Sequence, residues 1–299
     1  MLNLKTMKTM KQVIYFCIFC AICVTMTSCE KAIEGHEDDG NVRLTFAPSV
    51  QDIGTRGTVT VGDFFQKMNI QLFDASGSKV FDKVRTQTRD DDDFGVMSLQ
   101  LKPGTYTVIS VGHSSAVSAN IKSTEMVQFT ASGGEKLTDT FCYCGQVTVG
   151  DEPAEYTLTM NRVDAMFRLV MTDEEIPPTV AKIKLDYSGG SANFNPSTFE
   201  GCTKSSQSET RTVSSSKQYV AFTFPYMATS CNLRMTITAL TEDGTAIHSR
   251  VLEDVPVTRN RITTYTGQYF VGDGPWTVTQ TEFGFTVNGD WDGEDHYEF

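Results

Sequence analysis

Apolar and polar residues alternate along most of the chain after residue 41, with the two-residue period of β-strands. The alternation is clear in VRLTF (42–46), MNIQLFD (68–74) and TYTVISVG (105–112). Turn-forming segments such as ASGS and SGGE separate these stretches, a spacing typical of antiparallel β-sandwiches. With 299 residues, the chain is long enough for two such domains. We therefore predict an all-β protein with two tandem antiparallel β-sandwich domains.

Two dipeptides favour hairpin turns. The Asp-Gly pair at 243–244 suits the positive backbone angles of a tight turn. The Pro-Gly pair at 103–104 likewise separates two strands in LQLKPGTYTVISV. By contrast, the polar run at 203–217 predicts a long loop, and TVGDFFQKM (60–68) is the one stretch that suggests a short amphipathic helix.

The first 28 residues differ from the rest of the chain. Lys5, Lys8 and Lys11 precede the apolar run VIYFCIFCAICV (13–24), which is shorter than the roughly 20 residues of a bilayer-spanning helix. A basic start followed by a short apolar run indicates a signal peptide. The predicted parts of the chain are a signal peptide (1–28), an acidic tether (29–41), an N-terminal sandwich domain (42–163) and a C-terminal sandwich domain (164–299).

Cys29 directly follows this predicted signal peptide. The stretch MTSC resembles the lipobox of bacterial lipoproteins, with Met26 where leucine is commoner. Cleavage before Cys29 would make it the first residue of the mature protein and the site of lipid attachment. Several acyl chains on one cysteine anchor a protein stably, whereas a single chain binds a membrane only marginally. We expect lipid on Cys29 to hold the chain at the outer membrane, with EKAIEGHEDDG (30–40) as a solvated tether.

Four further cysteines remain after the signal peptide and Cys29. In CYC, Cys142 and Cys144 lie two residues apart and therefore on one face of a strand. A disulfide between Cys202 and Cys231 is left open by the sequence. No Cys-x-x-Cys pair exists among the four, so a zinc site is not expected.

Composition and motifs give no positive sign of catalysis or of a cofactor. The net charge of −12 argues against a nucleic-acid partner, which needs clustered Lys and Arg. Ser114 in GHSSA follows a strand but precedes no amphipathic helix, so a turn is favoured over a hydrolase nucleophile. The four histidines lack metal-ligand spacing. We expect no enzymatic activity and no cofactor.

Two acidic segments match a calcium loop only in part. RDDDDFG places Phe94 where an oxygen ligand is needed, so a solvated loop is favoured. Asn288, Asp290 and Asp292 in NGDWDG have better spacing, but Phe299 stands where a bidentate glutamate is required. A polar C-terminal loop without metal is the favoured interpretation, and calcium at these three residues stays open.

Several stretches in a fixed order resemble one family. They are the lipobox, IQLFDASG, LKPGTYTVISVG, YTLTMNRVDAMFRLVMT, FPYM and DVPVTRNRITTYTGQYF. In this order they resemble the Bacteroidales fimbrial anchor family, the fimbrillin-associated anchor lipoproteins of FimB type. The resemblance implies two transthyretin-like sandwiches and a role in assembling adhesive fimbriae on the cell surface. It also implies that other fimbrial subunits are the partners, joined by strand exchange, in which a strand of one chain completes the open sheet of another.

The resemblance makes Arg56 a candidate protease site, although an ordinary loop arginine is the favoured interpretation of this residue by itself. Pilins of this kind are freed from lipid by a cut after an arginine, which removes the first strand, and Arg56 follows the stretch 42–46. If Arg56 is cut, Cys29 is discarded and the chain is a stalk or tip subunit. Otherwise the chain caps the fimbria at the membrane, which the motifs favour. A surface glycan-binding lipoprotein is a further alternative that needs an aromatic platform, although Trp276 and Trp291 are the only tryptophans.

Overall fold

A computed structural model describes residues 40–49, 60–130, 136–270, 277–279 and 294–295. Gly40–Phe299 group into one compact unit. The regular elements of the described residues are strands, apart from one short 3₁₀ turn, η1 (Val61–Asp63). The all-β prediction is confirmed. Within these ranges no helix has the length and apolar character needed to cross a bilayer.

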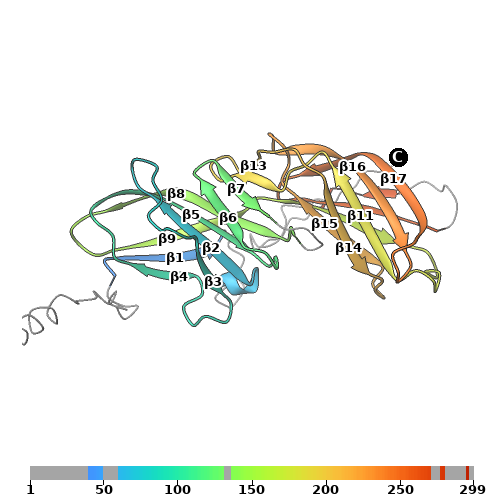
Figure 1. Cartoon of the computed structure of the whole chain (residues 1–299), viewed down its shortest axis with the longest axis horizontal. Coiled ribbons are helices and arrows are strands. Elements are labelled where there is room, and N and C mark those ends of the chain that lie inside the picture. Colours follow the sequence, from blue (N-terminus) through green and yellow to red (C-terminus); the bar gives the residue numbers. More distant parts are fainter. Residues whose placement is uncertain (1–39, 50–59, 131–135, 271–276, 280–293, 296–299) are drawn as a thin grey trace, which may run out of the picture. The chain divides into compact units, whose positions relative to one another are not determined.

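The first sandwich has seven strands around one apolar core. They are β1 (Val42–Pro48), β2 (Lys67–Phe73), β3 (Arg85–Thr88), β4 (Val96–Leu99), β5 (Gly104–His113), β8 (Thr140–Val149) and β9 (Ala154–Arg162). Their hydrogen-bonded order is β3-β2-β5-β8-β9-β1-β4, and Figure 1 labels the seven strands. The core lies between β3-β2-β5-β8 on one side and β9-β1-β4 on the other. We call this core the β1 core.

A second set of seven strands repeats this arrangement. They are β10 (Ala165–Met171), β11 (Lys182–Ser188), β14 (Gln207–Thr212), β15 (Gln218–Thr223), β16 (Ser230–Leu240), β17 (Ala246–Thr258) and β18 (Ile262–Gly267). They form the orders β15-β10-β18 and β14-β11-β16-β17, and β18 also pairs with β19 (Thr277–Thr279) and β20 (Glu294–Asp295). When the strands of each sandwich are numbered in chain order, the first to seventh strands of the second sandwich occupy the same positions in its sheets as the first to seventh strands of the first sandwich.

The two equivalent first strands, β1 and β10, have parallel partners. β1 pairs in parallel with β9 and antiparallel with β4. β10 pairs in parallel with β18 and antiparallel with β15. The sandwich prediction is therefore confirmed, but these two strand pairs, like β18 with β20, are parallel rather than antiparallel.

A further sheet takes strands from both halves of the chain. β6 (Ala119–Ser123) and β7 (Met126–Phe129) precede β9, whereas β12 (Asn193–Asn195) and β13 (Glu200–Gly201) follow β10. The four pair in the order β13-β12-β7-β6, and we call them the junction sheet. The junction sheet encloses a separate apolar cluster, the junction core, together with residues of β2, β5 and β8.

Strands β2 and β5 are buried on both faces because the junction sheet covers the face that the β1 core does not. Every residue of β2 after Lys67 is buried, as are the last six residues of β5. The polar positions of β2 therefore need partners inside the protein. Nδ2 of Asn69 donates to Oγ1 of Thr86 at 2.8 Å, and Nε2 of Gln71 donates to the Phe81 carbonyl at 2.9 Å.

The two predicted hairpins have different outcomes. The Asp-Gly pair at 243–244 joins β16 and β17 as a hairpin, with the Thr241 N–H donating to the Thr245 carbonyl at 2.9 Å. The Pro-Gly pair at 103–104 does not form a hairpin, because β4 pairs with β1 whereas β5 pairs with β2 and β8. That prediction is wrong because turn residues mark where strands end and do not specify which strands pair.

Two other local predictions are also wrong. The polar run 203–217 contains β14, an edge strand whose inward residues include Gln207 and Glu209. Glu209 lies 3.3 Å from the guanidinium of Arg211. The inward position of Glu209 therefore holds a paired charge instead of an apolar residue, so the sequence lacks the apolar alternation that identifies a strand. The segment 60–68 forms only η1, because β2 already begins at Lys67.

Candidate functional site

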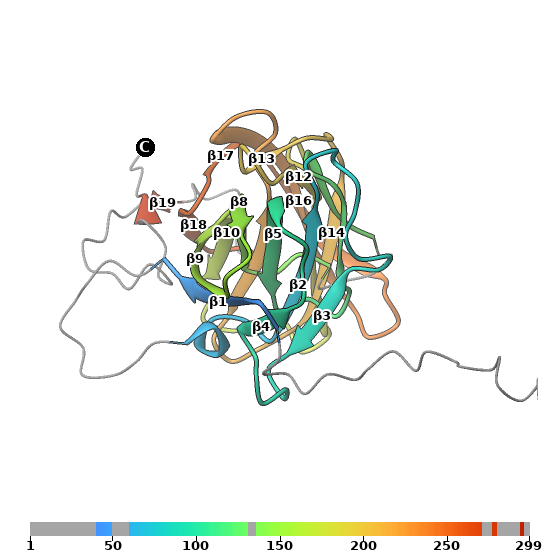
Figure 2. The same ribbon diagram turned by 90° about the vertical axis from the view of Figure 1, so that its left-hand side faces the viewer.

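Strand β1 lies in a slot between β9 and β4 (Figure 2). It pairs with β9 along its whole length and with β4 over Val42–Thr45. Both edges of β1 are thus hydrogen-bonded, and its removal would leave two unpaired strand edges facing each other. An exposed strand edge is a template for pairing with another chain.

Alternate side chains of β1 fill the β1 core. Val42 and Leu44 are fully buried, and Phe46 is 4% exposed. Arg43 is exposed and Thr45 half-buried on the opposite face. Burial of one large apolar side chain contributes roughly 1.5–3 kcal/mol. Any strand that replaced β1 would therefore need apolar residues at three alternate positions.

Asn41 fixes the upstream end of the slot. Its Nδ2 donates to the Leu101 carbonyl at 2.7 Å, and the Leu101 N–H donates to its Oδ1 at 2.9 Å. The Ala154 N–H donates to the Asn41 carbonyl at 2.9 Å. Gly40 approaches β4 so closely that a Cβ would lie 2.7 Å from the backbone nitrogen of Leu99. These contacts set the register in which β1 enters the sheet.

Gly95 forms the other end of the slot. The Phe46 N–H donates to the Gly95 carbonyl at 2.8 Å. Gly95 has a φ of +90°, a conformation that favours glycine, and a Cβ there would lie 2.6 Å from Cγ2 of Val61. Nε2 of Gln87 donates to the Val96 carbonyl at 2.6 Å. The side chain of Gln87 thus ties β3 to β4 beside the slot.

The chain connections of β1 and β10 differ. β10 follows β9 after only Val163 and Asp164, and both residues are buried. β1 is joined to η1 by residues 49–60, which include Arg56. A cut after Arg56 would leave β1 held in its slot by hydrogen bonds and packing alone.

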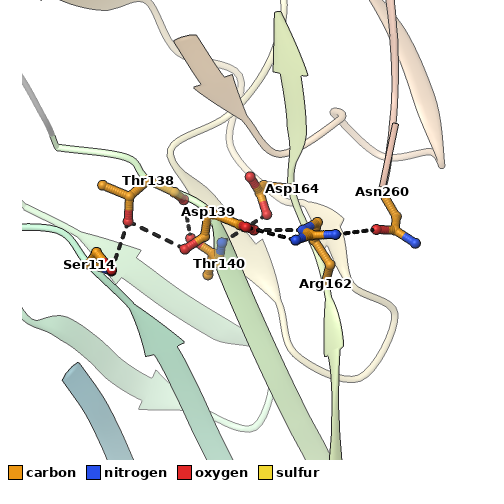
Figure 3. Close-up of polar contacts among 7 residues, drawn as sticks. All are labelled: Ser114, Thr138, Asp139, Thr140, Arg162, Asp164 and Asn260. Carbon is orange, nitrogen blue, oxygen red and sulfur yellow. Dashed lines mark hydrogen bonds and ion pairs between the residues drawn. The ribbon is translucent and has the colours of Figure 1, made fainter. Parts of the chain in front are cut away.

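A second polar site surrounds the β9–β10 connection (Figure 3). Nε and Nη2 of Arg162 donate to the two carboxylate oxygens of Asp139 at 2.6 and 2.8 Å. Nη1 of Arg162 donates to Oδ1 of Asn260, between β17 and β18, at 3.1 Å. The guanidinium carbon lies 4.7 Å from the ring centroid of Phe141. Arg162 therefore connects the first sandwich to the second through charge-assisted bonds.

Asp164 is a second carboxyl group beside this single guanidinium. Its Oδ1 accepts the Thr140 N–H at 3.0 Å, whereas Oδ2 is buried with no hydrogen-bond partner among the described residues. Burial, followed by the charge of Asp139, raises the pKa of Asp164 well above its usual value. Because the folded pKa is raised, ionisation of Asp164 removes stability as the pH rises from the ordinary aspartate range through the folded pKa.

Replacing Asp164 by Asn should therefore stabilise the protein at neutral pH. The amide introduced by Asp164→Asn keeps an acceptor for the Thr140 N–H and removes a carboxyl group whose ionisation the buried site disfavours, for an expected gain of about 1–3 kcal/mol. Urea unfolding at pH 7 measures the gain. Asp139→Asn is the matched control and should destabilise, because it removes the partner of Arg162. A loss of stability in both variants would contradict the assignment.

His113 ties β5 to the start of β6. The Ser115 N–H donates to its Nδ1 at 3.2 Å, so Nε2 carries the proton and donates to Oδ1 of Asn69 at 2.9 Å. The Ala119 N–H donates to the same oxygen at 2.7 Å. Burial, followed by the charge of Lys67, lowers the pKa of His113 to about 3.

Protonation of His113 should therefore destabilise the protein in acid. Its contribution is fully present above pH 6.5 and is lost as the pH falls toward 3. Between pH 7 and pH 5, the free energy of unfolding should fall by about 2 kcal/mol through this group. Urea unfolding at both pH values should show this loss in the wild type and not in His113→Gln. An equal loss in both chains would assign the acid sensitivity to other groups.

The described residues include only some of the predicted site residues. Cys29, Arg56 and the trio Asn288, Asp290 and Asp292 lie outside them, so lipid attachment and cleavage stay predictions, and calcium at the trio stays open. The aspartates of RDDDDFG lie in turns, and no cluster of three metal-ligating side chains occurs in the described ranges.

The cysteines and Ser114 have structural positions. Cys202 and Cys231 are separate thiols, so the disulfide that the sequence left open is absent here. Cys142 and Cys144 both contact the junction core, as their spacing on one strand face predicted. The Ser114 N–H donates to Oγ1 of Thr138 at 3.0 Å after the end of β5, in a connection rather than at the start of a helix.

Sequence reasoning missed the polar site around Arg162 altogether. The only available signal is the break in alternation at NRVDA, where the charged residues Arg162 and Asp164 stand at the end of one strand and just before the next. The exposed large apolar side chains of the described residues are Met227, Ile247 and Val251. None of these is aromatic.

The fold and the slot define a class of tandem β-sandwich proteins in which the first strand is held between two others. In this chain, the segment that joins the first strand to the next element contains the candidate cleavage site Arg56. The chain belongs to the DUF6562 family, a family of unknown function, whose model matches residues 37–298. No curated protein matches the chain.

Three solved structures illustrate what the chain is similar to. A candidate polysaccharide-binding protein of Bacteroides thetaiotaomicron has 9% identity and a TM-score of 0.50, covering 84% of this chain and 96% of that one. The fimbrial anchor protein Mfa2 of Porphyromonas gingivalis has 13% identity and a TM-score of 0.40, covering 86% and 99%. A fimbrial assembly protein of Parabacteroides distasonis has 12% identity and a TM-score of 0.42, covering 80% and 94%. At these identities the similarity concerns the fold alone.

Proposed function

We propose that the chain is a non-enzymatic subunit of a surface fimbria that supports cell adhesion and joins its neighbours at the β1 slot. The observation that carries the proposal is the seat of β1: a strand with two hydrogen-bonded edges, three buried alternate side chains and a following segment that contains Arg56. A strand from a neighbouring subunit that entered between β9 and β4 would restore the same backbone pairing.

The proposal includes export as a lipoprotein. Lipid on Cys29 would hold the precursor at the outer membrane, and the acidic tether would separate the lipid from the sandwich. A chain that keeps Cys29 would remain at the membrane as the base of the fimbria. A chain cut after Arg56 would lose its lipid and its covalent hold on β1, and would become a stalk or tip subunit.

Mass spectrometry of the N-terminus of the protein from the cell surface tests the proposal. An acylated Cys29 at the start of the chain would support the membrane-anchored form. A start at Gly57 would support the processed form with an exchangeable β1. A surface protein that starts at neither residue would contradict lipoprotein export followed by strand exchange.

A further inference from the structure

Sheet strands β2, β5 and β8 form a wall between the β1 core and the junction core. In β5, Val108 packs in the β1 core with Leu44, whereas Ile109 and Val111 pack in the junction core with Phe194. Successive residues of one strand thus contact two different cores, because side chains alternate across a sheet. A change in the packing of the β1 core should therefore alter the packing of the junction core through the shared strands.

The far side of the junction core is formed by the second half of the chain. Phe194 of β12 and Phe224, which follows β15, have ring centroids 4.7 Å apart. The Phe224 ring stacks on Phe129 of β7 with centroids 6.0 Å apart. β12 also pairs with β7, with Phe194 opposite Val127. Apolar packing and backbone pairing therefore join the two halves at the same place.

Hydrogen bonds also join the two halves of the chain at this junction. The Asn260 N–H donates to the Asp164 carbonyl at 2.7 Å, and Asn260 also accepts from Arg162. Oγ of Ser197 donates to the Thr124 carbonyl at 3.1 Å. The connection between β9 and β10 is only two buried residues long, so it offers no flexible linker between the sandwiches.

We propose that the β1 slot and the second sandwich are thermodynamically coupled through this wall, so that a change at β1 lowers the stability of β11 and β16 as well. The two sandwiches then open as one cooperative unit rather than as two independent domains. Loss of β1 from its slot would therefore also lower the stability of the second sandwich. The inference rests on packing, strand pairing and hydrogen bonds within one chain, and it holds whether or not the slot accepts a strand from another subunit.

Hydrogen exchange of the full chain at increasing urea concentrations tests the coupling. In the wild type, the slowest amides of β5 and β16 should share one opening transition, because both belong to one cooperative unit. In Leu44→Ala, exchange in both strands should rise by the same factor, about 30-fold or more. Thr45→Ala, on the opposite face of β1, should leave both strands within about threefold of the wild type.

Two results would overturn the coupling. One is a wild type in which β5 and β16 open in separate transitions. The other is a Leu44→Ala chain in which exchange rises in β5 while β16 keeps its wild-type rate. If Leu44→Ala is too unstable to purify, Leu44→Val provides the same comparison with a smaller, equal rise expected in both strands.

Discussion

Replacing Arg162 by Met should destabilise the protein by about 3 kcal/mol, the lower end of the cost of removing one partner of a buried ion pair, because the Asp139 side chain is 28% exposed. The side chain of Arg162 is 2% exposed, and its guanidinium is the cation that holds Asp139. The variant would leave Asp139 and Asp164 close together without a compensating positive charge. It would also remove the bond from Arg162 to Asn260 that joins the two sandwiches. Urea unfolding at pH 7 measures the loss.

A surface ion pair provides the matched control for this variant. Arg234 and Glu253 lie 2.9 Å apart with exposed fractions of 57% and 60%, so Arg234→Met should cost less than about 1 kcal/mol. Arg162→Lys should fall between the two, because it keeps the charge and loses the bidentate geometry. An Arg162→Met chain as stable as Arg234→Met would contradict the role given to the buried pair.

Truncating Leu44 to Ala should cost about 2–5 kcal/mol, because it empties the centre of the β1 core. Leu44 is fully buried at the middle of β1, between the equally buried Val42 and the Phe46 ring. The lost packing weakens the hold on a strand that a cut after Arg56 would leave without a covalent link. The urea midpoint of the uncut chain measures the cost.

The outward face of the same strand supplies the comparison for Leu44→Ala. Thr45→Ala removes a half-buried side chain and should change stability by less than about 0.5 kcal/mol. If the two substitutions had similar effects, the buried face of β1 would not be what holds the strand in its slot.

The sequence predicts the strand-rich class well because alternation directly reflects strand geometry. It predicts less about which strands are neighbours, since the partner of a strand depends on the whole fold. The 103–104 turn, which connects strands that do not pair, is one example. The strand β14 is another, because Glu209 is buried beside Arg211 and hides the apolar pattern.

The candidate site was likewise predictable from the sequence only in part. The first strand and the segment with Arg56 follow from the sequence and the family resemblance, but the parallel pairing of β1 with β9 does not. The cluster at Arg162 was not predictable from alternation, because Asp139 is 23 residues away and meets Arg162 only after β8 and β9 pair. Long-range charge pairs of this kind are defined by tertiary structure.

Locking β1 into its slot tests most directly whether subunits join there. Arg43 and Ser98 lie opposite each other on β1 and β4. The Phe46–Gly95 hydrogen bond places them at a position without mutual backbone bonds, where side chains lie closest. A disulfide in Arg43→Cys/Ser98→Cys would hold β1 even after a cut at Arg56, and Arg43→Cys alone is the control.

Assembled subunits from the cell surface would then be counted by denaturing gel electrophoresis and immunoblotting. If a neighbouring strand enters the β1 slot, the oxidised double variant should give no assembled species, and reduction should restore them to the level of the Arg43→Cys control. Assembly of the oxidised double variant at the wild-type level would contradict subunit joining at the β1 slot.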